Sequence, residues 1–522
     1  MRCSQRMAVL SKTLTVVIML LALHAQAQTF ESNNIKYQIL DADKAKVAIV
    51  GTNLKSGTIT LPSSVIYNDK EYIVEEIGDF AFNSLTNLNI NGQLPSHLKK
   101  IGQSAFGKCS RLGKTLILPT SLEVIGERAF SYAGISGTLI LPDSLKRLDE
   151  ACFIGCKDIT TIEFRAKSMP DSGVRQYLFN EIYQNNVIGG GYVKLIIGNN
   201  VERIPACMFQ SLYQYFLSFE KKSRCTEIGA YSFSYTNPGV CGSIDLPSSI
   251  RTIGTSAFKN CSKLTGLTFA EGDDARLISI GDNAFDYCTN LAGNLHLPSS
   301  VESIGKEAFN NCSKLSDTLV LPDSLKYLGT HAFCNCSGIS SIDYKAVAMP
   351  DDGVAYDPFS NMVAANNDTL SFRIAKTVER IPKSLCNSLY RYTLSFENGS
   401  RCREIGSSSF ACSGGKGIVG NLSFPDGLRI IGEKAFENNK ELQCISFSKG
   451  LEQIGAKAFS GCMSMKADLN FPISLTNIGD AAFEQCKAID SKIVLPATLT
   501  NIGNGAFTGC VNIRAIDFNC IK

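Results

Sequence analysis

The amino-acid sequence predicts an α/β repeat solenoid, a fold in which one short unit is stacked many times. The phrase Ile-Gly-x-x-Ala-Phe, with small variations, recurs about every 24 residues over about 18 coils, a period typical of stacked-repeat proteins. A Leu-x-Leu-Pro phrase and a cysteine return at fixed positions in the same units. The phrase ends at Phe82, Phe106, Phe130, Phe153, Phe209, Phe233, Phe258, Phe285, Phe309, Phe333, Phe410, Phe436, Phe459, Phe483 and Phe507.

Each unit contains two predicted elements, which residues 121–142 illustrate. The Leu-Ile-Leu-Pro phrase at 139–142 alternates with period two and ends at proline, which predicts a short strand. The Ile-Gly-Glu-Arg-Ala-Phe phrase at 125–130 places its apolar residues on one helical face, which predicts a single helical turn. Gly126 suits the corner between the two elements. Stacked coils therefore predict a parallel β-sheet on one side and short helical turns on the other.

The first 27 residues have the features of a secretory signal peptide. Basic residues at 2, 6 and 12 precede an apolar run from Leu14 to Leu23, and small residues follow at 25 and 27. This pattern predicts cleavage after Ala27 and export of the remaining chain. The alternative is a retained anchor, but this run is too short for a hydrocarbon layer of about 30 Å. We expect no transmembrane span in the mature chain.

Residues 28–76 differ from the units that follow. Short alternating segments separated by Asp- and Asn-rich turns predict a β-rich N-terminal cap that shields the first coil. The solenoid is predicted over residues 77–522. A longer duplication lies on top of the short repeat, because Val201–Pro205 and its surroundings match Val378–Pro382. Each copy contains one irregular stretch, near 166–192 and near 346–369.

Units such as Leu297–Cys312 resemble the BspA-type, or Treponema-type, leucine-rich repeat. Ile-Gly, Ala-Phe, Cys and Leu-Pro all fall at the spacing of that repeat, and the resemblance covers nearly all of the chain after residue 27. The resemblance implies a curved leucine-rich-repeat solenoid with a concave parallel β-sheet and short helical turns on the convex side. It also implies a surface or secreted protein, since some members are adhesins for host matrix proteins or other bacteria. The family has no shared catalytic residues.

Cysteine is the most frequent chemically active residue in the repeat. In stacked coils these side chains are expected to form an inward ladder of packing thiols. Neighbouring rungs would be about 5 Å apart, and this distance does not exclude a disulfide bond between them. Ala133, Leu212, Thr236 and Asn439 fill the same slot elsewhere, which favours packing over bonding. Nine of the 20 cysteines share the position: Cys109, Cys156, Cys261, Cys288, Cys312, Cys336, Cys462, Cys486 and Cys510.

The sequence does not favour an enzyme, a metal site or a bound cofactor. His97, His296 and His331 are the histidines after residue 27, and they lie in different coils. His331 is close to Cys334 and Cys336, but no second pair of ligands accompanies them, as structural zinc would require. No nucleophile elbow, Walker loop or zincin motif is present. The net charge of +3 implies no bulk attraction to nucleic acid.

The strand phrase predicts one outward-facing position per coil. If Leu139 and Leu141 face inward, Ile140 faces outward, and this position forms a lane across the coils. The apolar members Ile117 and Ile140 are a candidate protein-contact zone. The alternative is that β-branched residues simply suit an exposed strand. The expected lane has no lysine or arginine, which disfavours nucleic acid: Thr60, Gln93, Ile117, Ile140, Glu163, Ile196, Ser218, Asp245, Thr268, His296, Val320, Asp343, Ser371, Ser395, Ser423, Ser446, Asn470, Val494 and Asp517.

The two irregular stretches provide the other candidate contact residues. These are Met169, Tyr177 and Tyr183 in the first stretch and Met349 and Tyr356 in the second. Methionine and aromatic residues on projecting loops are typical interaction anchors. The alternative is that the loops are mere insertions, in which Phe179 and Phe359 replace the phenylalanine of the repeat.

Together these features predict an exported or cell-surface, non-enzymatic binding protein. We expect adhesin-like recognition of a protein ligand, either a host matrix protein or another cell-surface protein, through the repeat surface. One alternative is a structural or spacer component of the cell envelope. Another is a glycan-capture protein, but the expected lane carries no phenylalanine, tyrosine or tryptophan on which a sugar ring would stack.

Overall fold

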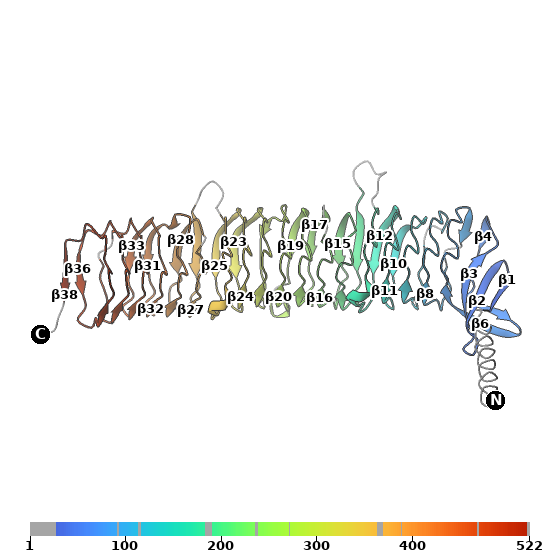
Figure 1. Cartoon of the computed structure of the whole chain (residues 1–522), viewed down its shortest axis with the longest axis horizontal. Helices are drawn as coiled ribbons and strands as arrows, with labels where there is room; N and C mark the ends of the chain where they lie inside the picture. The colour runs from blue at the N-terminus through green and yellow to red at the C-terminus, as the bar shows by residue number, and fades with distance from the viewer. Residues whose placement is uncertain are drawn as a thin grey trace, which may run out of the picture. The chain divides into compact units, whose positions relative to one another are not determined.

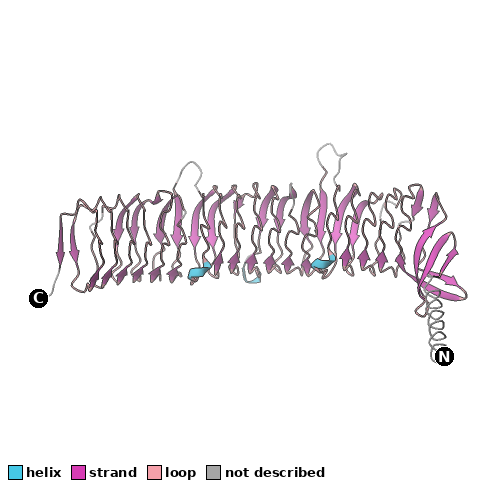
Figure 2. Ribbon diagram, viewed as in Figure 1, coloured by secondary structure: helices cyan, strands magenta, loops and turns pink. Residues whose placement is uncertain are grey.

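The computed structural model describes residues 28–90, 93–112, 116–182, 191–234, 238–270, 272–362, 369–387, 389–466 and 469–518. The predicted signal peptide and Tyr183 lie outside the described residues. The chain divides into two compact units, Met1–Val193 and Lys194–Lys522. Each unit is a parallel β-solenoid built from strands and turns (Figure 2).

Unit 1 begins with antiparallel strands and continues as a parallel stack (Figure 1). Strand β1 pairs antiparallel with β2, β2 with β3, and β5 with β6. From β3 and β6 onward the pairs are parallel, through β8, β9 and β11. The elements are β1 (Thr29–Ser32), β2 (Ile35–Asp41), β3 (Lys46–Thr52), β4 (Gly57–Ile59), β5 (Ser64–Tyr67), β6 (Lys70–Ile77), β7 (Leu88–Ile90), β8 (Lys100–Ile101), β9 (Val124–Ile125), β10 (Ser136–Leu141), β11 (Arg147–Leu148), β12 (Asp158–Phe164) and the 3-10 turn η1 (Asp171–Gly173).

Unit 2 repeats two kinds of parallel strand, starting from β13 (Val193–Ile197), which spans the division. The first kind, the longer strands, lies at or just before the leucine phrase and has up to seven residues, although β21 and β30 are short: β15 (Gln214–Phe219), β17 (Gly239–Asp245), β19 (Lys263–Thr268), β21 (Gly293–Asn294), β23 (Leu315–Leu321), β25 (Ile339–Tyr344), β26 (Leu370–Ile374), β28 (Arg391–Phe396), β30 (Gly417–Ile418), β31 (Gly420–Ser423), β33 (Leu442–Ser446), β36 (Lys492–Leu495) and β38 (Ala515–Phe518).

The second kind of strand contains the isoleucine or leucine of the Ile-Gly phrase, has two residues and lies along the lower edge in Figure 1. They pair with one another from coil to coil. In unit 2 they are β14 (Arg203–Ile204), β16 (Glu227–Ile228), β18 (Thr252–Ile253), β20 (Ser279–Ile280), β22 (Ser303–Ile304), β24 (Tyr327–Leu328), β27 (Arg380–Ile381), β29 (Glu404–Ile405), β32 (Ile430–Ile431), β34 (Gln453–Ile454), β35 (Asn477–Ile478) and β37 (Asn501–Ile502).

A column of phenylalanine rings runs through the core of each unit. In unit 1 the rings of Phe106 and Phe130 stack with centroids 5.2 Å apart and planes within 8°. Phe153 stacks in turn on Phe179 at 5.8 Å, and in unit 2 Phe333 stacks on Phe359 at 6.2 Å. These contacts confirm that Phe179 and Phe359 replace the phenylalanine of the repeat in the irregular units. Parallel offset stacking is a favoured aromatic geometry and fixes the spacing of the coils.

The predicted solenoid of stacked parallel strands is confirmed, with one departure: the short helical turns expected in each unit are nearly absent from the described coils. In the turn after Gly126, Arg128 and Tyr132 have left-handed φ angles of 51° and 52°, which a right-handed helix does not contain. The N–H of Phe130 donates to the carbonyl of Cys152 in the next coil at 2.8 Å, rather than within its own turn. Among the described residues the helical elements are 3-10 turns, η1, η2 (Gly272–Asp274) and η3 (Asp351–Gly353).

Candidate binding surface

The outer side of the longer strands is the candidate binding surface, and we call it the long-strand face. Its origin is the period-two alternation of the leucine phrase. Leu139 and Leu141 are buried, whereas Ile140 between them is 37% exposed, as the sequence predicts. One outward residue from each coil is thereby presented to solvent.

In unit 1 the long-strand face carries two exposed isoleucines. Ile117 is 56% exposed and forms a parallel bridge with Gln93, and Ile140 pairs with Glu163. The carboxylate of Glu163 accepts hydrogen bonds from Arg165 at 2.6 and 3.1 Å, so its charge is neutralised locally. The result is an apolar pair, Ile117 and Ile140, in successive coils with polar residues on both sides.

In unit 2 the expected lane needs one correction. Asp343 lies opposite Arg373 and not opposite Ser371, which pairs with Ser341 instead. Arg373 in turn lies opposite Ser395. The strand register therefore places an arginine in the lane that was expected to have no cations. Asp343 forms a two-pronged ion pair with this arginine, with Nε and Oδ1 2.9 Å apart.

The irregular units present their tyrosines and bury their methionines. Tyr177 is 54% exposed and Tyr356 is 68% exposed. Charge repulsion from Asp357, together with a hydrogen bond to it, raises the pKa of Tyr356. Met169 and Met349 are 0% and 1% exposed, which corrects the expectation that they project as anchors. The physical reason is that each methionine fills the apolar interior of an irregular coil.

The sequence interpretation overlooked Phe216, an aromatic residue on the long-strand face of unit 2. This side chain is 44% exposed between buried Tyr215 and Leu217 on β15. The exposure of Phe216 could have been predicted from the alternation along Gln214–Phe219. If Tyr215 and Leu217 point inward, both Phe216 and Ser218 point outward. The lane considered only Ser218.

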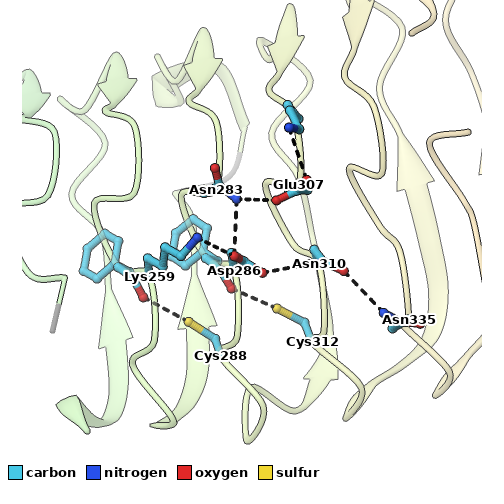
Figure 3. Close-up of polar contacts among 11 residues, drawn as sticks. Lys259, Asn283, Asp286, Cys288, Glu307, Asn310, Cys312 and Asn335 are labelled. Carbon is cyan, nitrogen blue, oxygen red and sulfur yellow. Dashed lines mark hydrogen bonds and ion pairs between the residues drawn. The ribbon is translucent and has the colours of Figure 1, made fainter. Parts of the chain in front are cut away.

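The cysteine ladder lies in the interior and its thiols are free. Each repeat cysteine donates a hydrogen bond to the phenylalanine carbonyl of the preceding coil, such as Cys288 to Phe258 and Cys312 to Phe285, both at 3.2 Å (Figure 3). Asn439 fills the slot by donating to the carbonyls of Phe410 and Phe436. All described cysteines are unbonded to one another. This arrangement confirms a packing role and gives the carbonyls partners.

A network of polar side chains lies within the turns of unit 2 (Figure 3). Its centre is Asp286, whose side chain is 2% exposed and whose Oδ2 lies 2.9 Å from Lys259 Nζ. Asn283 donates to Asp286 at 3.2 Å and to Glu307 at 2.8 Å. Asn310 donates to the other carboxylate oxygen at 3.0 Å. Both oxygens of Asp286 have partners within the turns, so the cluster holds neighbouring coils together.

The described residues include no group of three or more His, Cys, Asp and Glu side chains suited to a metal ion. A shallow hollow with a cavity volume of about 10 Å³ lies in unit 2. This volume is below the 300–1,000 Å³ range of small-molecule sites. Its walls include Leu246, Ile250, Phe269, Arg276 and Pro298. No helix in the described part of the chain is long and apolar enough to cross a membrane.

The model of the BspA-type leucine-rich repeat region, in six copies, matches residues 75–188, 180–292, 273–385, 357–490 and 403–521. No curated protein matches the chain.

Three solved bacterial proteins are similar to the chain at low identity. A leucine-rich repeat protein from Bacteroides ovatus is 20% identical, over 91% of this chain and 99% of that one, with a TM-score of 0.36. A leucine-rich cell surface protein from Faecalibacterium prausnitzii is 19% identical, over 96% and 97%, with a TM-score of 0.27. The pneumococcal vaccine antigen PcpA is 17% identical, over 94% and 82%, with a TM-score of 0.23. Similarity at this level says nothing about a shared function.

Proposed function

Because the chain belongs to the family of BspA-type leucine-rich repeat proteins, we propose that it is an exported recognition protein that binds a protein partner at its long-strand face. Its role is binding and not catalysis. The first 27 residues act as a secretion signal that is cleaved after Ala27, and residues 28–76 cap the first coil. The released chain is secreted or displayed at the cell surface.

The exposed pair Ile117 and Ile140 carries this proposal. Their exposed fractions are 56% and 37%, although the leucines beside them are buried. Full burial of an exposed aliphatic side chain contributes about 1.5–3 kcal/mol, and covering the exposed parts of these two residues supplies a fraction of that at each position. Gln93 and Glu163 provide the polar rim that surrounds the apolar centre of a typical interface.

The character of this face favours a protein over other partners. Nucleic acid needs several cations on one surface, and the arginine of the lane, Arg373, is already paired with Asp343. Sugar rings stack on aromatic side chains; Phe216 is exposed on this face in unit 2, but the two central residues of the unit 1 patch are aliphatic. A partner with its own apolar side chains, such as a host matrix protein or a bacterial surface protein, fits the patch.

The test uses the exported chain and an Ile117→Ser/Ile140→Ser variant against immobilised fibronectin, laminin, collagen and whole bacterial cells. We expect the wild-type chain to bind at least one of these targets. The variant is expected to bind that target at least about tenfold more weakly, which corresponds to a loss of about 1.4 kcal/mol. Surface plasmon resonance measures both affinities.

The matched control is Ile66→Ser, because Ile66 is a 72% exposed isoleucine on β5 of the same unit but away from the long-strand face. Its affinity should equal that of the wild type, and both variants should keep the wild-type urea midpoint. Equal binding by the wild type and the double variant would refute the role of the patch. Absence of binding to every target would favour a structural spacer of the envelope, and selective binding to glycans would favour glycan capture.

A further inference from the structure

This inference rests on the proposed function, in which the signal peptide is cleaved after Ala27. Gln28 is then the first residue of the exported chain. It lies immediately before β1, which is the edge strand of its sheet. The N–H of Ile39 donates to the carbonyl of Gln28 at 2.9 Å. The backbone of this residue is therefore held on β2 through its carbonyl group.

We infer that the α-amine of Gln28 closes onto its own side chain and forms an N-terminal pyroglutamate. The amine nitrogen bonds to the side-chain carbonyl carbon Cδ, the Cδ–Nε2 bond breaks, and Nε2 leaves as ammonia with the proton that the amine gives up. The product is a five-membered lactam. The step is an amide exchange, so it needs no oxidant, reductant or second substrate.

The surroundings of Gln28 permit this step. The residue is exposed, and its Nε2 lies 3.4 Å from the hydroxyl of Tyr67, at the long limit of a hydrogen bond. This weak contact leaves the side chain free to rotate towards the amine. An α-amine has a pKa of about 7.7–8.0, so roughly a tenth of it is neutral and nucleophilic at about pH 7.

The strand that follows stays fixed during the reaction. The ring of Phe30 stacks on Tyr67 with centroids 4.1 Å apart and on Tyr37 at 5.2 Å. These contacts anchor β1 independently of the Gln28 side chain. Cyclisation therefore leaves the strand in place while it removes the terminal positive charge and the free amine that aminopeptidases require.

The test uses the full-length precursor, exported through its own leader. The N-terminal α-amine of the intact exported protein is first labelled with a deuterated acetyl reagent at about pH 6, where lysine amines stay protonated and unreactive, and the protein is then digested with trypsin. The N-terminal peptide is 28–36, since Lys36 is the first basic residue after Ala27. We expect this peptide to lack the label at its N-terminus and to be lighter than the uncyclised peptide by one ammonia. Pyroglutamyl peptidase should then remove one residue and expose Thr29.

The Gln28→Ala precursor is the matched control, because alanine has no side-chain amide; its N-terminal peptide should carry the label. A labelled wild-type peptide 28–36 at full mass would overturn the inference and leave export and cleavage intact. An N-terminus at any other residue would overturn both the inference and the proposed cleavage after Ala27.

Discussion

At the scale of single residues, burial explains the chemistry of the cysteine ladder. Burial raises the pKa of Cys261 and of Cys156 to about 12 and that of Cys109 to about 11. A thiol whose pKa is raised by the fold reacts slowly, because the thiolate is the nucleophile. These three thiols are therefore chemically quiet, whereas a hydrogen bond with Cys486 lowers the pKa of Cys510 at the end of the ladder.

This raised pKa predicts a loss of stability at high pH. The pKa of the Cys261 thiol is about 9 in the unfolded chain and about 12 in the folded chain. Its contribution to the free energy of unfolding is complete below about pH 9 and is lost as the pH rises towards about 12. Between pH 8 and 10 the free energy of unfolding should fall, by about 1.4 kcal/mol for each such thiol. Urea unfolding at both pH values measures this. In Cys261→Ala the loss should be smaller by about that amount, and an unchanged loss would contradict the assignment.

The glycine of the Ile-Gly phrase is required by close backbone approach and not by a special φ angle. At Gly281 an added Cβ would lie 2.7 Å from the nitrogen of Thr255 and 2.8 Å from the carbonyl carbon of Gly254. Both atoms belong to the backbone of the preceding coil and cannot rotate away. Gly414 has the opposite surroundings, with nothing within 4 Å of an added Cβ.

We therefore expect Gly281→Ala to lower the free energy of unfolding by about 1–3 kcal/mol, because the two coils must separate to admit the methyl group. Gly414→Ala is the control and should be neutral or stabilising by up to about 1 kcal/mol. Thermal and urea unfolding of the two variants provide the measurement. Equal stabilities would mean that the coils tolerate a wider spacing than the structure has.

At the scale of the element, the turn after each Ile-Gly phrase is organised by the neighbouring coil. In one turn of unit 2, Asn283 and Tyr287 have left-handed φ angles of 55° and 59°. The N–H of Phe285 between them donates to the carbonyl of Ala308 in the next coil at 2.7 Å. A helix would satisfy these groups within the turn, whereas this geometry directs them along the stack.

The same turns hold the network centred on Asp286, and this predicts a large effect of one substitution. Asp286→Ala removes the partner of Lys259, Asn283 and Asn310, so we expect a loss of about 2–3 kcal/mol in the free energy of unfolding. Asp286→Asn keeps the shape and one acceptor and should lose less.

Lys306→Ala serves as the control for this network. The Lys306 side chain is 55% exposed and lies 3.4 Å from Glu307, so its removal should change stability by less than about 0.5 kcal/mol. Urea unfolding compares all three variants. Similar losses for Asp286→Ala and Lys306→Ala would show that the network adds nothing beyond a surface ion pair.

At the scale of the whole molecule, each unit is stabilised by contacts between neighbouring coils. A fold of this kind has no single central core, and its stability is approximately a sum of repeat and interface terms. The rings of Phe258 and Phe309 lie on either side of Phe285 at 5.1 Å each. Removal of one complete coil should therefore leave two surfaces that fit each other.

Deletion of residues 281–304, which joins Ile280 to Gly305, is expected to preserve the fold because it removes one full repeat of 24 residues. Phe258 would then stack on Phe309. Deletion of residues 293–304 removes half a repeat and should prevent folding around the junction. Far-ultraviolet circular dichroism and urea unfolding distinguish the two outcomes. Equal disruption by both deletions would contradict a nearest-neighbour architecture.

Much of the fold and part of the candidate surface could be read from the sequence. The strand phrase with Leu139 and Leu141 predicted the exposure of Ile140, because alternation along a strand is a local property. The burial of Met169 and Met349 could not be read, since whether a loop residue projects depends on how the irregular coil closes. The place of Arg373 in the lane could not be read for a related reason. A shift of two residues in the pairing of β25 with β26 decides whether Ser371 or Arg373 lies opposite Asp343.

The repeat period, the stacked parallel strands, the phenylalanine column and the inward cysteines are determined by the sequence itself, because they recur with a period that any stacking of identical coils must respect. Only the tertiary structure decided three features: the residues with left-handed φ angles in the turns, the pairing of Asp343 with Arg373, and the hydrogen bonds of the Asp286 network. Each of these depends on backbone or polar groups that find their partners in an adjacent coil, and no local pattern of residues specifies which partner that is.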